Sequence, residues 1–231
     1  MHSHGVLMDR IYRRQRYFYD LTRKYYLVGR DRLIRDLDLR PGSSAVEVGC
    51  GTARNLIAIA GHYPGTRLFG LDVSLTMLET ARRAVEHAGL SDRILLVHGY
   101  AEALVPELFG EKLPFDCAIF SYSLSMIPDW CSALEVANRA LVPGGRLHMV
   151  DFGDFSGLGR FGALALRRWL RMFHVEPRTE LLYALEGAIA GGLVGDLWVS
   201  PRRYAFAWSV PRCSTRAFAN VAGQPQAAGN P

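Results

Sequence analysis

The feature that most constrains the fold is an alternation of short apolar runs and helix-like segments in the first two thirds of the chain. The apolar runs have the length and composition of buried strands, and they cover residues 43–48, 67–73, 93–99, 115–122 and 146–152. Segments with helical periodicity separate several of them, over residues 52–63, 74–88 and 130–140. Because apolar strands that alternate with helices form a parallel sheet covered on both faces, we expect an α/β fold with a mostly parallel sheet.

The C-terminal part of the chain follows a different pattern. Two β-like runs, 196–200 and 204–210, are separated by a Pro-Arg-Arg turn, which predicts an antiparallel hairpin at the edge of the sheet. The last residues are small and poor in apolar side chains. We therefore divide the chain into an N-terminal helical lid, one domain and a disordered tail, over residues 1–40, 41–212 and 213–231.

A glycine-rich turn follows the first predicted strand, in the stretch AVEVGCGTAR. A dinucleotide loop needs a third glycine where Arg54 stands, and the phosphate-loop pattern GxxxxGK[ST] is absent. The carboxylate of Glu47 would repel a pyrophosphate but attract a ligand that carries ammonium and sulfonium groups. Asp72, at the end of the second predicted strand, suits the two hydroxyls of a ribose. Together these residues favour a cationic, ribose-bearing cofactor without phosphates.

Five ordered motifs between residues 43 and 153 resemble those of the class I S-adenosylmethionine-dependent methyltransferases: VEVGCGTA, LFGLDVS, HGYAEAL, FDCAIFSYSLSMIPDW and LVPGGRLHMVD. The resemblance implies the Rossmann-like fold of that class and S-adenosylmethionine as the cofactor. It also implies a set of cofactor-binding residues, namely Glu47, Gly49, Cys50, Gly51, Thr52, Asp72, Val73, Met77, Tyr100, Ala101 and Ser121.

The same resemblance implies a role for each part of this set. The loop around Glu47 would meet the methionine part of the cofactor, Asp72 the ribose, and Met77 with its neighbour Val73 the adenine. One position departs from the family, which often has Asp or Asn after the glycine of the third loop. This chain has Tyr100 there, and its ring can stack on adenine but cannot replace a carboxylate.

The composition limits the partners and the compartment. The formal net charge of +5 favours an anionic partner. The four cysteines include no CxxC pair, which predicts a reducing compartment and no structural zinc. The N-terminal residues do not read as a signal peptide, so we expect a cytoplasmic location. The apolar stretch 181–199 contains Glu186 and Asp196, which argue against a membrane span.

The segment before the domain bears on the methyl acceptor. Residues 9–38 are helix-like, with a break expected at Gly29, and they are dense in arginine and tyrosine. The signature [DN]PP[YF] of nucleic-acid and protein amide methylation is absent, because the corresponding loop reads SYSLSMIP. We therefore expect no nucleic-acid partner. The run YDLTRKYYLVGRDRLIRDLDLRPG is instead similar to the betaine-lipid N-methyltransferases, which add three methyl groups to the amine of diacylglyceryl-homoserine.

This similarity implies a lipid amine as the acceptor. Tyrosine rings attract an amine that becomes a quaternary ammonium, so we expect the amine pocket to include Tyr19, Tyr25, Tyr26 and Tyr122. Arg30 is expected to bind a carboxylate, of the cofactor or of the homoserine. Since the methyl group of a sulfonium is already activated, the enzyme mainly has to hold a neutral amine in line with it and exclude water.

Basic residues set among apolar ones also predict contact with the anionic inner face of a membrane. One such group lies in the N-terminal helical region, and a second consists of Arg160, Arg167, Arg168 and Arg171. A solvated arginine face over an aromatic core is the alternative interpretation. Other acceptors also stay open, either phosphatidylethanolamine or a small-molecule or quinone-type acceptor, as does a non-catalytic protein that only binds the cofactor.

Overall fold

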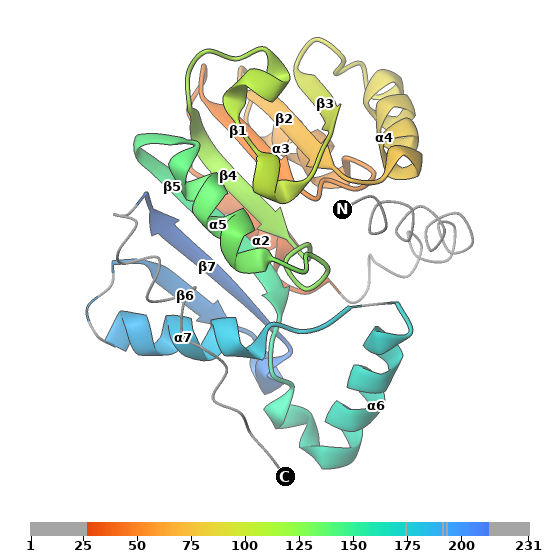
Figure 1. The fold of residues 1–231 in the computed structure, drawn as a ribbon, viewed down its shortest axis with the longest axis vertical. Helices are drawn as coiled ribbons and strands as arrows, with labels where there is room; N and C mark the ends of the chain where they lie inside the picture. The colour runs from red at the N-terminus through yellow and green to blue at the C-terminus, as the bar shows by residue number, and fades with distance from the viewer. Residues whose placement is uncertain (1–26, 174, 191, 193, 213–231) are drawn as a thin grey trace.

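The structure, a computed structural model, describes residues 27–212 except 174, 191 and 193. One sheet of seven strands, in the order β3-β2-β1-β4-β5-β7-β6, forms its centre (Figure 1). The strands are β1 (Ser44–Val48), β2 (Arg67–Asp72), β3 (Ile94–His98), β4 (Phe115–Ser121), β5 (Leu141–Phe152), β6 (Asp196–Val199) and β7 (Ala205–Pro211). The predicted α/β class is therefore confirmed.

The pairing of the strands separates a parallel part from an antiparallel edge. Strands β1 to β5 pair in parallel, whereas β7 is antiparallel to both β5 and β6. The C-terminal hairpin predicted from the sequence thus forms at the edge of the sheet. Strand β5 begins earlier than expected, because Leu141 pairs with Phe115 before a register shift that accommodates the Pro-Gly-Gly turn.

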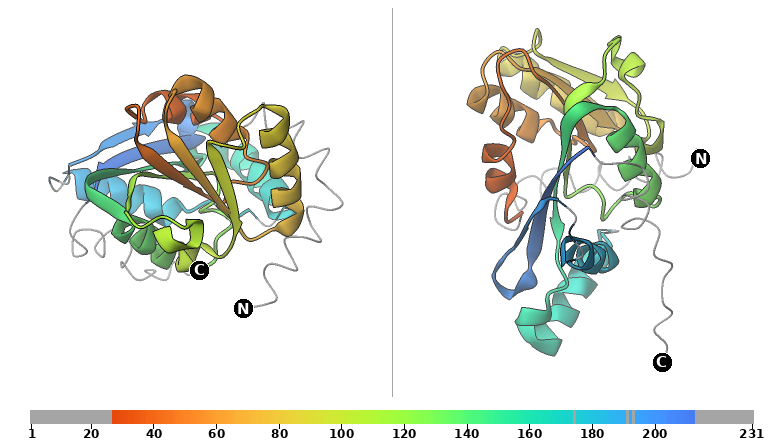
Figure 2. Two further views of the ribbon diagram at one scale, coloured as in Figure 1. Left: turned by 90° about the horizontal axis from the view of Figure 1, so that it is seen from above. Right: turned by 90° about the vertical axis from the view of Figure 1, so that its left-hand side faces the viewer.

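Helices cover both faces of the sheet (Figure 2). One apolar layer joins the sheet to three helices, α2 (Arg30–Arg35), α3 (Arg54–His62) and α4 (Leu75–His87). The other face packs against α5 (Trp130–Arg139) and α7 (Thr179–Ala190). A further helix, α6 (Gly159–Arg171), follows β5 and extends beyond the carboxyl end of the sheet (Figure 1). This arrangement places the ends of β1, β2 and β4 next to the first turns of α3 and α4.

The backbone turns at Gly29, the residue at which a helix break was expected. Its φ of +90° lies in the left-handed region, and a Cβ there would lie 2.7 Å from Cζ3 of Trp198. Helix α2 begins directly afterwards and buries Leu33 and Ile34, and Leu37 is also buried. The lid predicted over residues 1–40 lies mostly outside the described residues, and so does the tail predicted over residues 213–231.

The apolar stretch 181–199 is divided between helix α7 and strand β6. Within the described part of the chain, no helix is long and apolar enough to cross a membrane. Glu186 of this stretch receives two hydrogen bonds from the guanidinium of Arg203, at 2.8 and 3.1 Å. Arg203 also donates to Asp154 at 2.7 Å, so this cluster joins α7 to the loop that precedes α6.

The structure buries one histidine in the sheet, and this has a consequence for stability. His148 on β5 lies opposite Ser209 of β7, and desolvation, with a smaller effect of Arg146, lowers the pKa of its ring to about 4. The unfolded chain takes up this proton near pH 6.5. The contribution of the neutral ring to stability is therefore complete above pH 6.5 and is lost as the pH falls toward 4.

We expect His148→Leu to remove this acid sensitivity. The difference in unfolding free energy between the variant and the wild type should shift by about 3 kcal/mol in favour of the variant between pH 7 and pH 4. Urea unfolding at several pH values measures it. The pH dependence of the wild type alone does not isolate the effect of His148. Burial raises the pKa of Asp151 to about 6, so the stability that this carboxyl group contributes is lost in the opposite direction, as the pH rises. Parallel curves for the two proteins would contradict the role given to His148.

Candidate active site

Three polar side chains lie near the carboxyl ends of neighbouring strands. Glu47 lies on β1, Asp72 ends β2 and Ser121 ends β4, and β1 pairs with both other strands. All three side chains are buried. In an open parallel sheet, ligands bind beyond the carboxyl ends of the strands, so this edge is the expected position of a site.

The loop after β1 has a backbone that glycine makes possible. Gly49 has a φ of +75° and Gly51 a φ of +55°, both in the left-handed region. A Cβ on Gly49 would lie 2.6 Å from the Cβ of Ser123, closer than real side chains approach. The amide of Gly49 donates to the carbonyl of Leu71 at 2.8 Å, which holds the loop against β2. At Gly49 the loop backbone therefore packs directly against Ser123, with no room for a side chain.

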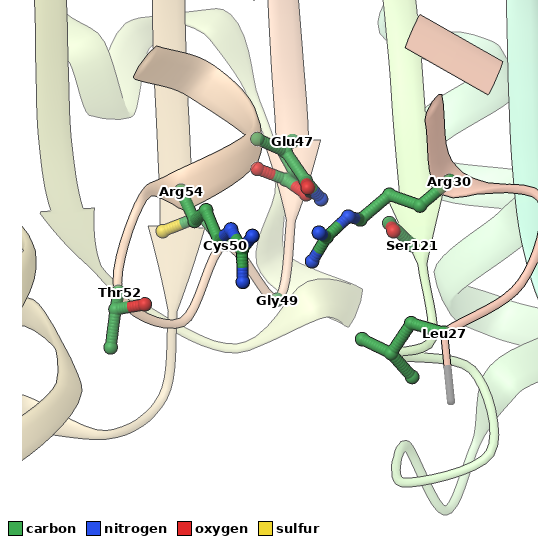
Figure 3. Close-up of a pocket in the computed structure, with 9 residues that line it drawn as sticks. Leu27, Arg30, Glu47, Gly49, Cys50, Thr52, Arg54 and Ser121 are labelled. Carbon is green, nitrogen blue, oxygen red and sulfur yellow. Dashed lines mark hydrogen bonds between the residues drawn. The ribbon is translucent and has the colours of Figure 1, made fainter. Parts of the chain in front are cut away.

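A small cavity of about 30 Å³ opens at this loop. Figure 3 shows that the side chains of Arg30, Glu47 and Arg54 point into the same space. The lining residues are Leu27, Arg30, Glu47, Gly49, Cys50, Thr52, Arg54, Asn55 and Ser121. The structure thus brings together the predicted cofactor residues of the loop, Ser121 from β4 and Arg30 from α2.

A carboxylate and a guanidinium group line this cavity. Glu47 is almost fully buried, and its Oε1 accepts a hydrogen bond from Nδ2 of Asn55 at 2.6 Å. Arg30 enters from the opposite side on α2, so a carboxylate and a guanidinium face the same small space (Figure 3). A ligand with both an ammonium and a carboxylate group matches this pair of charges.

Asp72 fastens the glycine loop to the start of α4. Its Oδ2 accepts from the amide of Gly51 at 2.7 Å, and its Oδ1 accepts from the amide of Ser74 at 2.9 Å. A carboxylate has about four lone-pair positions, so one such group can accept from backbone amides and from a hydroxyl. The structure therefore gives Asp72 a positioning role, which is compatible with the predicted contact to a ribose.

The predicted adenine residues lie around Asp72 and outside the lining of the small cavity. Met77 is buried at the start of α4, in an apolar cluster with Val73, Met126 and Phe173. The loop with Tyr100 and Ala101 follows β3, and its Gly99 amide donates to the carbonyl of Asp72 at 3.0 Å. Their contact with adenine stays a prediction, as do the other assigned contacts.

Tyr122 lies outside the lining of the small cavity, and its predicted contact with an amine stays a prediction. It is buried, and its hydroxyl donates to the backbone carbonyl of Val28 at 2.5 Å. Burial is the main cause that raises the pKa of this phenol. Instead of facing Glu47, Tyr122 lines a neighbouring apolar cavity with Leu27, Phe152, Trp169, Leu170, Phe173 and Val175. Tyr122 therefore holds residues 27 and 28 in place, and the predicted partners Tyr19, Tyr25 and Tyr26 lie outside the described residues.

Three residues that line the cavity were not predicted from the sequence, namely Leu27, Arg54 and Asn55. Asn55 holds Glu47, and Arg54 lines the cavity, although Arg54 served only to exclude a dinucleotide. Both stand in the first turn of the helix that follows the glycine loop. Their position is the signal that was available, because the first turn of such a helix always faces the ligand-binding edge of the sheet.

The comparisons with known proteins agree with this geometry. Residues 45–145 match a family model described as a methyltransferase domain. The chain is 35% identical over 131 residues to a demethylmenaquinone methyltransferase of Bacillus mycoides, and equally to one of Bacillus cytotoxicus. These matches cover 56% of this chain and 53% of each relative, so the chain spans about half the length of the curated relatives it matches.

Solved structures of methyltransferases share the fold. One from Aquifex aeolicus, described as SAM-dependent, superposes with a TM-score of 0.59 at 16% identity, over 83% of this chain and 93% of the other. A geranyl diphosphate methyltransferase in complex with GPP and sinefungin gives a TM-score of 0.61 at 14% identity, over 80% and 77% of the two chains. The protein therefore has the Rossmann-like fold of these methyltransferases, and its residues 45–145 resemble a methyltransferase domain.

Proposed function

We propose that the protein binds S-adenosylmethionine at the cavity around Glu47 and transfers its methyl group to the head group of a membrane lipid. The observation that carries the cofactor assignment is that Glu47 and Arg30 both line the small cavity at the glycine loop. This arrangement suits a zwitterionic amino-acid group, and a buried carboxylate at this position disfavours a pyrophosphate.

The described residues fit the parts of this cofactor. The carboxylate of Glu47, held by Asn55, is placed to receive an ammonium, and the guanidinium of Arg30 a carboxylate. Asp72 accepts a hydrogen bond from the glycine loop, at the place where the ribose would follow the methionine part of the cofactor. Met77 and Val73 offer an apolar surface for the adenine beyond it. Gly49 carries no side chain, so its backbone can pack against Ser123 and leave space beside the loop for the part of the cofactor that joins the methionine to the ribose.

The mechanism needs positioning more than it needs a strong base. When bound, S-adenosylmethionine supplies a methyl group that is already activated by its sulfonium. The residues of this chain then have to hold the acceptor in line with that methyl group and keep water out. Ser121 at the end of β4 is buried at the cavity wall, where it would help to orient the reacting groups. An amine acceptor loses its proton to bulk water or to a weak base.

The second cavity supports an acceptor with apolar character. Its lining is mostly aromatic and aliphatic, and Leu27 belongs to the walls of both cavities. A molecule that enters beside Trp169 and Phe173 would therefore reach the cofactor cavity past Leu27.

Two lipid acceptors have specific support. The names of the curated relatives point to a quinone-type ring, and they favour that acceptor over a lipid amine. The motif that ends in LVGRDRLIRDLDLRPG points to the amine of diacylglyceryl-homoserine. The match spans 53% of the relatives' own length, and the family model matches residues 45–145 of this chain.

One assay separates these acceptors. Purified full-length protein is incubated with methyl-labelled S-adenosylmethionine and total bacterial lipids, and the labelled products are resolved by mass. Label in a zwitterionic lipid without phosphorus assigns the amine acceptor, and label in a quinone assigns the ring. Label in a phosphorus-containing lipid would assign phosphatidylethanolamine. No label in any lipid, with the cofactor bound normally, would refute the lipid acceptor and favour a non-catalytic protein or a small-molecule methyltransferase.

A further inference from the structure

Helix α6 presents an unusual outer face. Large apolar side chains are strongly exposed there, with 90% of Phe161, 60% of Leu164 and 67% of Met172 open to solvent. At about 100° per residue, these three positions fall within about a third of the helix circumference. Large apolar side chains that gather on one exposed face commonly mark an interaction surface, whereas single exposed apolar side chains are normal.

The same face is strongly basic. Arg160, Arg168 and Arg171 are exposed and fall on the same part of the helix circumference. The helix, with the sequence GRFGALALRRWLR, contains no acidic residue. The outer face therefore combines exposed apolar side chains with positive charge on a helix without acidic residues, which is the pattern of a helix that lies in a membrane interface.

The inner face of α6 packs against the described part of the chain. Leu170 is buried, and the rings of Trp169 and Phe173 meet at 5.0 Å between centroids. Arg167 donates to the carbonyl of Asp154 at 2.9 Å, and its guanidinium lies 5.7 Å from the ring centroid of Phe155. The helix is thus fixed to the end of β5 while Phe161 and its neighbours point away from the sheet.

We propose that the outer face of α6, formed by Arg160, Phe161, Leu164, Arg168, Arg171 and Met172, docks the protein on an anionic lipid bilayer. Charge selects this occupant, because the face carries only positive charge and lies at the carboxyl end of the sheet, where α6 projects (Figures 1 and 2). The inner face of the same helix lines the apolar cavity through Trp169 and Leu170. A lipid that leaves the bilayer at α6 would enter the site directly, so the inference rests on the proposed function.

The test is flotation of the full-length protein with vesicles of phosphatidylglycerol and phosphatidylcholine, or of phosphatidylcholine alone. We expect binding to the anionic vesicles only, and release as salt is raised. The double variant Phe161→Ser/Leu164→Ser should reduce the bound fraction about fivefold or more. The matched control Leu113→Ser/Val194→Ser removes two side chains that are 69% and 73% exposed elsewhere, and it should bind as the wild type does.

The outcomes that overturn the inference are specific. Equal flotation of the α6 variant and the wild type would place the contact elsewhere, for example on the basic N-terminal segment. Equal binding to neutral vesicles would contradict the charge argument. A change in molar mass by light scattering on Phe161→Ser/Leu164→Ser would make the face an interface between copies. Calorimetry with S-adenosylmethionine keeps the two proposals separate, because both double variants should bind the cofactor normally whether or not α6 docks.

Discussion

Replacing Asp72 by alanine is expected to weaken S-adenosylmethionine binding by more than tenfold. The substitution removes the proposed acceptor for the ribose hydroxyls, and hydrogen bonds to a charged group contribute about 1.5–3 kcal/mol each. It also leaves the amides of Gly51 and Ser74 without the bonds that fix the loop to α4. Isothermal titration calorimetry measures the affinity directly.

Controls for Asp72→Ala distinguish loss of the contact from loss of the fold. Asp72→Asn keeps one acceptor oxygen, so its affinity should lie between those of the alanine variant and the wild type. Thermal unfolding without cofactor shows whether each variant remains folded. A folded alanine variant with unchanged affinity would refute the ribose assignment and leave Asp72 a structural residue of the loop.

The second large effect is expected from Gly49→Ala. A non-glycine residue with left-handed backbone costs about 1–2 kcal/mol, and the new Cβ would lie 2.6 Å from that of Ser123. The Cβ of Ser123 is bonded directly to the backbone, so rotation of the Ser123 side chain does not relieve this contact. The loop itself therefore has to move. We expect cofactor affinity to fall by at least tenfold and the melting temperature to decrease.

A second substitution and a control make the reason for this effect testable. Ser123→Gly in the Gly49→Ala background removes the contact but not the backbone strain, so it should restore affinity only in part. Gly61→Ala adds a methyl group within α3 where nothing lies within 4 Å, and it should leave binding unchanged. Full affinity in Gly49→Ala would mean that the loop does not approach the cofactor closely.

The sheet could be predicted well because its signals are local. The first four strands match apolar runs that turn residues delimit. Ser74 and Asp129 are residue types that commonly cap helices, and each accepts a hydrogen bond from a first-turn amide of α4 or α5. The N-cap of α3 could not be predicted, because Ala53 adopts a left-handed conformation with a φ of +60° that the loop imposes. The end of each strand, and therefore the edge that holds the site, followed from the pattern alone.

The site itself could be predicted only in part. Glu47 and Asp72 were found because each stands at the end of a strand, where an acidic side chain has to serve either structure or a ligand. The placement of Tyr122 could not be predicted, because its partner is the backbone of Val28, distant in the sequence. Its residue type suggested an amine contact, whereas its burial follows from the packing of Phe152 against its ring.

The surface of α6 that is exposed depends on tertiary structure even more strongly. The arginines of α6 were visible in the sequence, but only the packing separates Arg167, which binds the carbonyl of Asp154, from Arg168, which is exposed. The exposure of Phe161 has the same origin, because it depends on which face of α6 meets the end of β5. Periodicity predicts that a helix has two faces, and the fold decides which of them is covered.

The central claim is that the cavity around Glu47 accepts S-adenosylmethionine and excludes nucleotides with phosphate groups. Calorimetric titration of the full-length protein with S-adenosylmethionine, S-adenosylhomocysteine, NAD and ATP tests it directly. We expect the two sulfur compounds to bind at one site and to compete with each other, and we expect NAD and ATP to give no heat of binding. Binding of NAD or ATP as tight as that of S-adenosylmethionine, or no binding of S-adenosylmethionine at all, would contradict the claim.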